Sequence, residues 1–74
     1  MTADDIRRIA YQRPFRPFRV TLASGEFIDI RRTLRTTVAE DRILFGLDED
    51  PETRVAKRLR IVALRDVAAV TPLE

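Results

Sequence analysis

Two Pro-Phe pairs near the N-terminus constrain the fold more than any other feature of this sequence. The chain reads R-P-F-R-P-F from Arg13 to Phe18 and continues as an alternating segment that ends at Ser24-Gly25. Proline fixes φ at about −65° and lacks an N–H donor, so a helix does not continue through this stretch. The segment is therefore predicted to connect an N-terminal helix to antiparallel β-structure.

The predicted helix spans residues 2–13. Thr2 is a favourable N-cap, two aspartates follow in the first turn, and Ile6 and Ile9 fall on one helical face. A helix of about ten residues is not stable alone in water. Its apolar face is therefore expected to dock on the strands that follow.

After the proline segment, apolar and polar residues alternate with the period of strands that bury one face. Phe18, Val20 and Leu22 share one face, and the glycine of Ser24-Gly25 accepts the positive φ of a hairpin turn. The chain returns in a second strand, in which Ile28 and Ile30 point inward. The later strand signals are short and lie at 36–39, 42–47, 58–63 and 67–70.

These patterns predict a mainly β (α+β) fold, with one N-terminal helix followed by about five short antiparallel strands. Closing the strands into a small bent barrel would remove exposed sheet edges. The whole of 1–74 is expected to form one domain, with the helix at 2–13 and a small Sm-like β-barrel at 16–74.

Composition argues against most enzyme classes. The chain has no cysteine and no histidine, so it lacks thiolate ligands and the usual general base. Its single serine, Ser24, lies in a predicted turn, and two glycines are too few for a phosphate-binding loop. The acidic residues of 48–52 fit a solvated loop better than a cation site. We expect no enzyme activity, no catalytic residue, no cofactor and no metal.

No apolar run approaches the roughly 20 residues that span a bilayer, and the first residues do not resemble a signal peptide. The expected location is the cytoplasm, without membrane association. A chain of 74 residues buries barely enough apolar surface to offset its conformational entropy. Self-association into a homo-oligomer is therefore expected.

Arginine dominates the basic residues. Lys57 is the only lysine among fourteen basic residues, and twelve acidic residues leave a net charge of +2. The arginines could reflect a GC-rich genome, or they could bind phosphate or carboxylate groups of a partner. The candidate nucleic-acid or partner contacts are Phe15, Arg16, Arg19, Arg31, Arg35, Arg58 and Arg60. In the alternative interpretation, the phenylalanines fill the core and the arginines form local ion pairs.

The Pro-Phe-Arg-Pro-Phe segment at 14–18, the Ser24-Gly25 turn and the closing run 66–71 resemble a group of small uncharacterised bacterial proteins. Those proteins begin with a short helix and a Pro-Phe-x-Pro-Phe segment, and their resemblance implies no activity. They often carry His-Pro-Glu after the second strand, whereas this chain has residues 32–35 without that motif. The expected order of elements is also similar to Sm-like barrels of the Hfq type.

Two functional hypotheses follow from the sequence. The first is a non-enzymatic binding or assembly module that self-associates through its β-structure and has a protein partner. The second is an Sm-like RNA or nucleic-acid-binding protein that uses the arginine-rich surface, and it is not the favoured one because the net charge is only +2.

Overall fold

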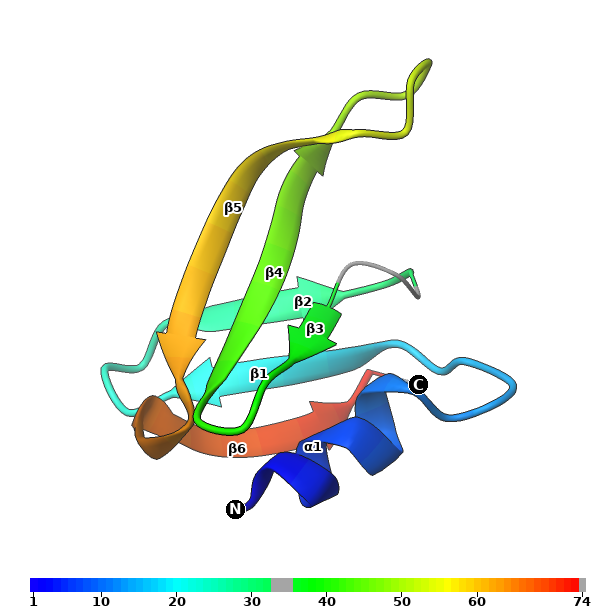
Figure 1. The fold of residues 1–74 in the computed structure, drawn as a ribbon. Coiled ribbons are helices and arrows are strands. Elements are labelled where there is room, and N and C mark those ends of the chain that lie inside the picture. The colour runs from blue at the N-terminus through cyan, green and yellow to red at the C-terminus, as the bar shows by residue number, and fades with distance from the viewer. Residues whose placement is uncertain (33–35, 74) are drawn as a thin grey trace.

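The computed structural model describes residues 1–32 and 36–73, and this part of the chain is mainly β with one N-terminal helix. Figure 1 shows the helix lying against one side of the strands. The elements in chain order are α1 (Ala3–Ala10), β1 (Phe18–Leu22), β2 (Phe27–Ile30), β3 (Thr36–Val38), β4 (Arg42–Glu49), β5 (Ala56–Ala63), the 3₁₀ turn η1 (Leu64–Asp66) and β6 (Val67–Pro72).

The six strands form two antiparallel sheets of three, in the orders β2-β1-β6 and β3-β4-β5. The expected mainly β class is confirmed, but the two sheets share no hydrogen-bonded strand pair within residues 1–32 and 36–73. They therefore do not close into one barrel there. The reason is non-local, since β1 takes β6 as its second neighbour and leaves β3, β4 and β5 to form their own sheet. The β4–β5 hairpin rises away from the other sheet (Figure 1).

The core lies between the two sheets and the helix. The largest fully buried side chains are Phe18 and Val20 of β1, Ile43 and Phe45 of β4, and Ile6 of α1. The inward faces predicted for the first two strands are confirmed, because the residues of β1 and β2 in phase with Phe18 are all buried. The turn between these strands also forms as predicted, and Gly25 adopts a φ of 94°.

Helix α1 begins as expected and ends early. The Thr2 hydroxyl accepts a hydrogen bond from the Asp5 N–H, and the Asp5 carboxylate accepts one from the Thr2 N–H. The predicted end at Arg13 was wrong, because the last helical residue is Ala10. Pro14 has no N–H for the Ala10 carbonyl, and its ring would clash there in a continued helix. No helix in the described part of the chain is long and apolar enough to cross a bilayer.

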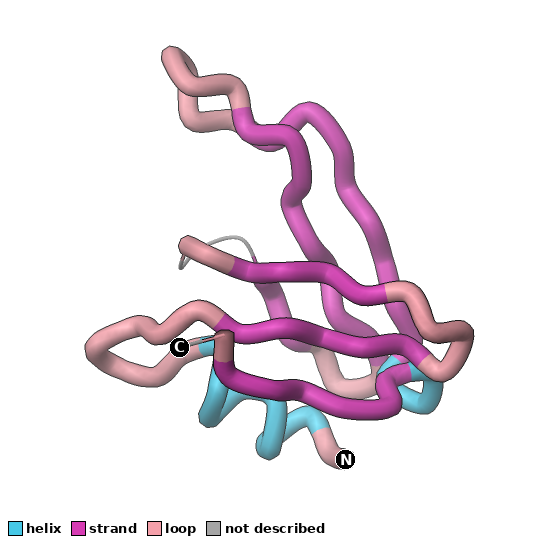
Figure 2. Tube along the Cα trace, turned by 180° about the vertical axis from the view of Figure 1, so that it is seen from behind, coloured by secondary structure: helices cyan, strands magenta, loops and turns pink. Residues whose placement is uncertain are grey.

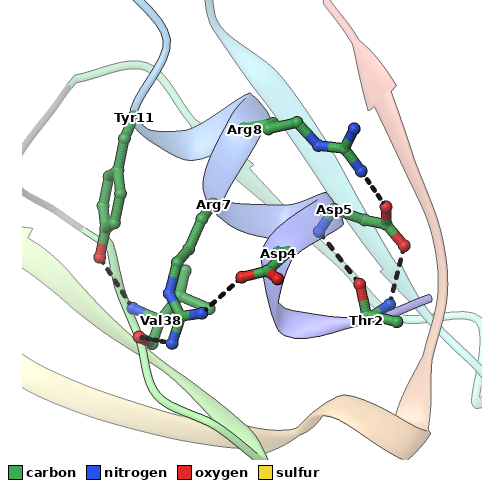
Figure 3. Close-up of polar contacts among 7 residues, drawn as sticks. All are labelled: Thr2, Asp4, Asp5, Arg7, Arg8, Tyr11 and Val38. Carbon is green, nitrogen blue, oxygen red and sulfur yellow. Dashed lines mark hydrogen bonds and ion pairs between the residues drawn. The ribbon is translucent and has the colours of Figure 1, made fainter.

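Side chains of α1 and of its C-cap residue Tyr11 cover the outer edge of β3 (Figure 3). The Val38 N–H donates to the Tyr11 hydroxyl oxygen at 3.0 Å, and the Arg7 guanidinium donates to the Val38 carbonyl at 3.4 Å. The same guanidinium also donates a hydrogen bond to the Asp4 carboxylate, with 2.9 Å between nitrogen and oxygen. Unpaired edge groups are templates for pairing with another chain. The helix thus protects the outer edge of β3 with side chains.

Candidate interaction surface

Strand β5 is the longest strand with an open edge. It has eight residues and, among the residues that the structure describes, pairs only with β4, so its other edge faces away from the sheet, as the view from behind in Figure 2 also shows. The other edge strands, β2, β3 and β6, have four, three and six residues. An exposed edge of eight residues is the feature that natural proteins normally cover or interrupt.

The backbone hydrogen bonds fix which groups lie on this open edge. The Leu64 N–H donates to the Asp41 carbonyl at 3.0 Å, next to the register pair Arg42–Ala63. In an antiparallel pair, opposite residues alternate between exchanging hydrogen bonds and exchanging none. The alternation therefore turns the N–H and C=O groups of Leu59, Ile61 and Ala63 toward the open edge.

The outer face of β5 is apolar from Leu59 to Ala63, next to the exposed Lys57. Leu59 is 64% exposed and Ile61 is 56% exposed, and Leu44 lies opposite Ile61 on β4. We call Leu44, Leu59 and Ile61 the outer strip. A strand in which apolar residues alternate with arginine usually buries its apolar side. Here the opposite holds for the middle of β5, since the face of Val62 contacts the core and the outer strip faces solvent.

The inner face of β5 carries Arg58, Arg60 and Val62. Val62 is buried, whereas the Arg60 guanidinium bonds both carboxylate oxygens of Glu26 at 3.1 and 3.3 Å. This hydrogen bond lowers the pKa of Glu26. Because Glu26 follows the β1–β2 turn, the ion pair connects the β4–β5 hairpin to the other sheet.

A hollow of about 290 Å³ lies beside the open edge, between β5 and the β1–β2 turn. Its polar lining includes Ser24, Glu26, Arg60 and Asp66. Arg60 and Glu26 neutralise each other, whereas the Asp66 carboxylate has no ion pair or hydrogen bond within the described residues. The hollow therefore has acidic character and lies next to unpaired backbone groups.

The chain exposes more surface area than a compact monomer of its mass. The chain of 8.6 kDa exposes 5261 Å², against about 4,700 Å² for a compact monomer of this mass. The excess of about 550 Å² approaches the roughly 600–1,000 Å² that each partner buries in a stable complex. The β4–β5 hairpin projects away from the rest of the fold (Figure 1).

The arginines proposed as contacts are spread over both sheets. Arg19 bonds Asp29 at 2.7 and 3.1 Å and lies over the Phe27 ring at 4.0 Å, and this pairing lowers the pKa of Asp29. Arg31 approaches the same Asp29 at 3.9 Å. Arg19, Phe27 and Asp29 lie on the outer face of the β2-β1-β6 sheet, and Arg31 follows the end of β2.

Arg58 and Arg60 share one face of β5, but each binds a carboxylate. Arg58 pairs with Asp48, and Arg60 pairs with Glu26. Arg16 is exposed and forms no ion pair within the described part of the chain. The predicted contact Arg35 lies outside the described residues.

Phe15 is half-buried rather than open to a partner. Its ring packs edge-on against Phe18 with the ring centroids 6.1 Å apart, and it contacts the core. Phe15 also lines a hollow of about 490 Å³ together with Tyr11, Arg13 and Thr36. The Thr36 hydroxyl is buried and has no hydrogen-bond partner among the described residues.

The residues that form the outer strip were not among the predicted contacts. Their alternation with arginine was visible in the sequence, but it did not indicate which side would face solvent. Within residues 1–32 and 36–73, no group of three or more acidic side chains is arranged to hold a metal ion. Comparison with protein families, curated proteins and solved structures finds no match to this chain.

Proposed function

We propose that this chain is a non-enzymatic assembly module of the cytoplasm that self-associates through β5. The observation that carries this proposal is the coincidence of the outer strip with the open edge of the longest edge strand. Contact of exposed Leu59 and Ile61 with the same residues of another chain would remove part of their apolar surface from water and gain hydrophobic free energy. Pairing of the edge would satisfy backbone groups that otherwise depend on water.

A second copy of the chain is the partner that the surface fits best. The excess surface area is close to what one partner of a stable complex buries. A self-associated module would also gain stability with concentration, which suits a chain too short to bury a large core.

The alternative function is Sm-like RNA or nucleic-acid binding through the arginine-rich surface. Four of its candidate arginines are already bound to carboxylates, which weakens the positive field that phosphates would meet. They also face different sides of two sheets. This alternative also requires the strands to close into an Sm-like barrel.

Light scattering on a size-exclusion column, with the 260/280 nm absorbance ratio recorded at low and high salt, tests both functions. We expect an oligomer at micromolar concentration, free of nucleic acid and insensitive to salt. A monomer at all concentrations up to about 100 μM would refute the assembly function. A high absorbance ratio that falls with salt would favour the alternative.

A variant pair sharpens this test. The double substitution Leu59→Thr and Ile61→Thr keeps β propensity and removes exposed apolar groups from the outer strip. We expect the dissociation constant of the oligomer to rise at least about 100-fold, because each lost methylene contributes about 0.8 kcal/mol. Phe27→Thr is the matched control, because Phe27 is 55% exposed on the other sheet. This control is expected to leave the oligomer intact.

A further inference from the structure

We infer that two copies pair their β5 strands in antiparallel orientation about a two-fold axis at Arg60. In this arrangement, Arg58 of each copy enters the hollow beside the other copy's Asp66. The inference rests on the proposed self-association and specifies its geometry.

The lengths of the open edges indicate that β5 of one copy pairs with β5 of the other copy. No other edge strand in the described part of the chain reaches eight residues, and the edge of β3 is already covered at Val38 by two side chains of the helix segment. Two identical strands that pair in antiparallel orientation form a closed, two-fold symmetric contact. This contact removes both exposed edges at once and joins two three-stranded sheets into one.

The backbone permits four registers that pair at least five residues of β5. Since Leu59, Ile61 and Ala63 carry the outward N–H and C=O groups, odd-numbered residues must lie opposite odd-numbered residues. The axis can therefore fall at Arg58, Leu59, Arg60 or Ile61.

Side chains and the length of the pairing distinguish the four registers. Axes at Arg58 and at Ile61 pair only residues 56–60 and 59–63 within the strands. An axis at Leu59 places Arg58 opposite the partner's Arg60 twice, whereas an axis at Arg60 places a single pair of arginines, the two copies of Arg60, opposite each other; like charges directly opposite each other are destabilising. An axis at Arg60 pairs residues 57–63, and it sets Leu59 opposite the partner's Ile61 twice, so that the outer strips form one apolar cluster.

The Arg60 register also provides a charge match on the inner face. It sets Arg58 opposite the partner's Val62, which lines the hollow that contains the unpaired carboxylate of Asp66. The surface ion pair of Arg58 with its own Asp48 is solvent-exposed on both sides and contributes little, so the guanidinium is available to the partner. The two copies of Arg60 face each other in this register, and each is neutralised by its own Glu26.

A cysteine scan measures the position of the axis. The natural chain has no cysteine, so single substitutions Leu59→Cys, Arg60→Cys and Ile61→Cys each introduce one reporter. At the axis, the Cα atoms of an Arg60 pair without mutual hydrogen bonds would be about 4.5 Å apart, within the range of a disulfide. We expect Arg60→Cys to form disulfide-linked dimers fastest under mild oxidation. Thr71→Cys, exposed on the other sheet, gives the rate of random collision.

Exchanging the charges of Arg58 and Asp66 tests the proposed contact between Arg58 and the hollow of the partner copy. Arg58→Asp and Asp66→Arg are each expected to raise the dimer dissociation constant about 10-fold or more. The double variant is expected to return within about threefold of the natural chain. Arg16→Asp removes the same charge far from β5 and is expected to change nothing.

The outcomes separate this inference from the proposed function. A natural chain that remains monomeric overturns both. A natural dimer in which the cysteine at 59 or at 61 cross-links fastest, or in which no position exceeds Thr71→Cys, overturns the register. A dimer in which the double charge variant is no better than the single variants overturns the contact between Arg58 and the hollow.

Discussion

The hydroxyl of Tyr11 offers the sharpest test of how the helix protects the sheet edge. Tyr11→Phe deletes one oxygen atom and leaves a ring that is already 48% exposed. The lost oxygen is the acceptor for the Val38 N–H at 3.0 Å. Val38 is only 7% exposed, so its amide would lose its partner where water has little access.

The expected loss is about 1–3 kcal/mol in the free energy of unfolding, the usual cost of an unsatisfied buried donor. For a chain of this size, that corresponds to a fall of at least about 4 °C in Tm. Urea unfolding followed by far-UV circular dichroism is the suitable assay, because Tyr11 is the only tyrosine and the chain has no tryptophan. Both proteins should be compared at equal concentration, since self-association adds to stability.

Hydrogen exchange of the Val38 amide gives the residue-specific readout. We expect its exchange to accelerate about 10-fold or more in Tyr11→Phe, since a tenfold change corresponds to about 1.4 kcal/mol. Thr37→Val is the matched control, because it removes an exposed hydroxyl on the same strand that makes no hydrogen bond in the described structure. Stability within about 0.5 kcal/mol of the natural chain together with an unchanged Val38 exchange rate would show that the hydroxyl does not protect the edge.

Three other perturbations have defined outcomes. Thr2→Ala removes one half of the capping box and should cost about 1 kcal/mol in urea unfolding; an unchanged midpoint would contradict the role of the cap. Gly25→Ala places a Cβ in open space but at a φ of 94°, so a loss of about 1 kcal/mol should come from the backbone alone. The pKa values of Asp29 and Glu26 are lowered mainly by hydrogen bonds from Arg19 and Arg60, respectively. The two ion pairs therefore stabilise the folded chain above the ordinary carboxyl pKa of about 4, and this contribution is lost as the pH falls through the lowered pKa values. Urea unfolding at pH 7 and pH 3 should show lower stability at pH 3, with a smaller difference in Asp29→Asn.

Local patterns in the sequence predicted the local elements well. Phe18, Val20 and Leu22 alternate in a segment that begins after a proline, and the structure buries all three. The hairpin turn at Gly25 and the N-cap at Thr2 also follow from residues within a few positions of each other. Such features depend on backbone sterics and short-range hydrogen bonds, which the sequence displays directly.

Non-local features could not be predicted in the same way. Both faces of β5 carry apolar residues, since Leu59 and Ile61 lie on one side and Val62 on the other. The side that turns inward is fixed by long-range contacts, since Val62 packs in the core and Arg60 bonds Glu26, 34 positions away in the sequence. The same limitation explains why the sequence did not predict two separate sheets in place of a closed barrel. The choice of β6 as the second neighbour of β1 is a long-range pairing.

That long-range pairing also affects the order in which the fold can form. Phe18 of β1 pairs with Pro72 of β6, whereas β1–β2 and β4–β5 are hairpins between neighbours in the chain. Closing a loop of this length costs more conformational entropy than closing a hairpin, so we expect the two hairpins to form first and β6 to join late. During synthesis on the ribosome, β1 therefore keeps an unpaired edge until β6 has emerged. Early termination of the chain before β6 would leave that edge exposed to the outer strand of another molecule.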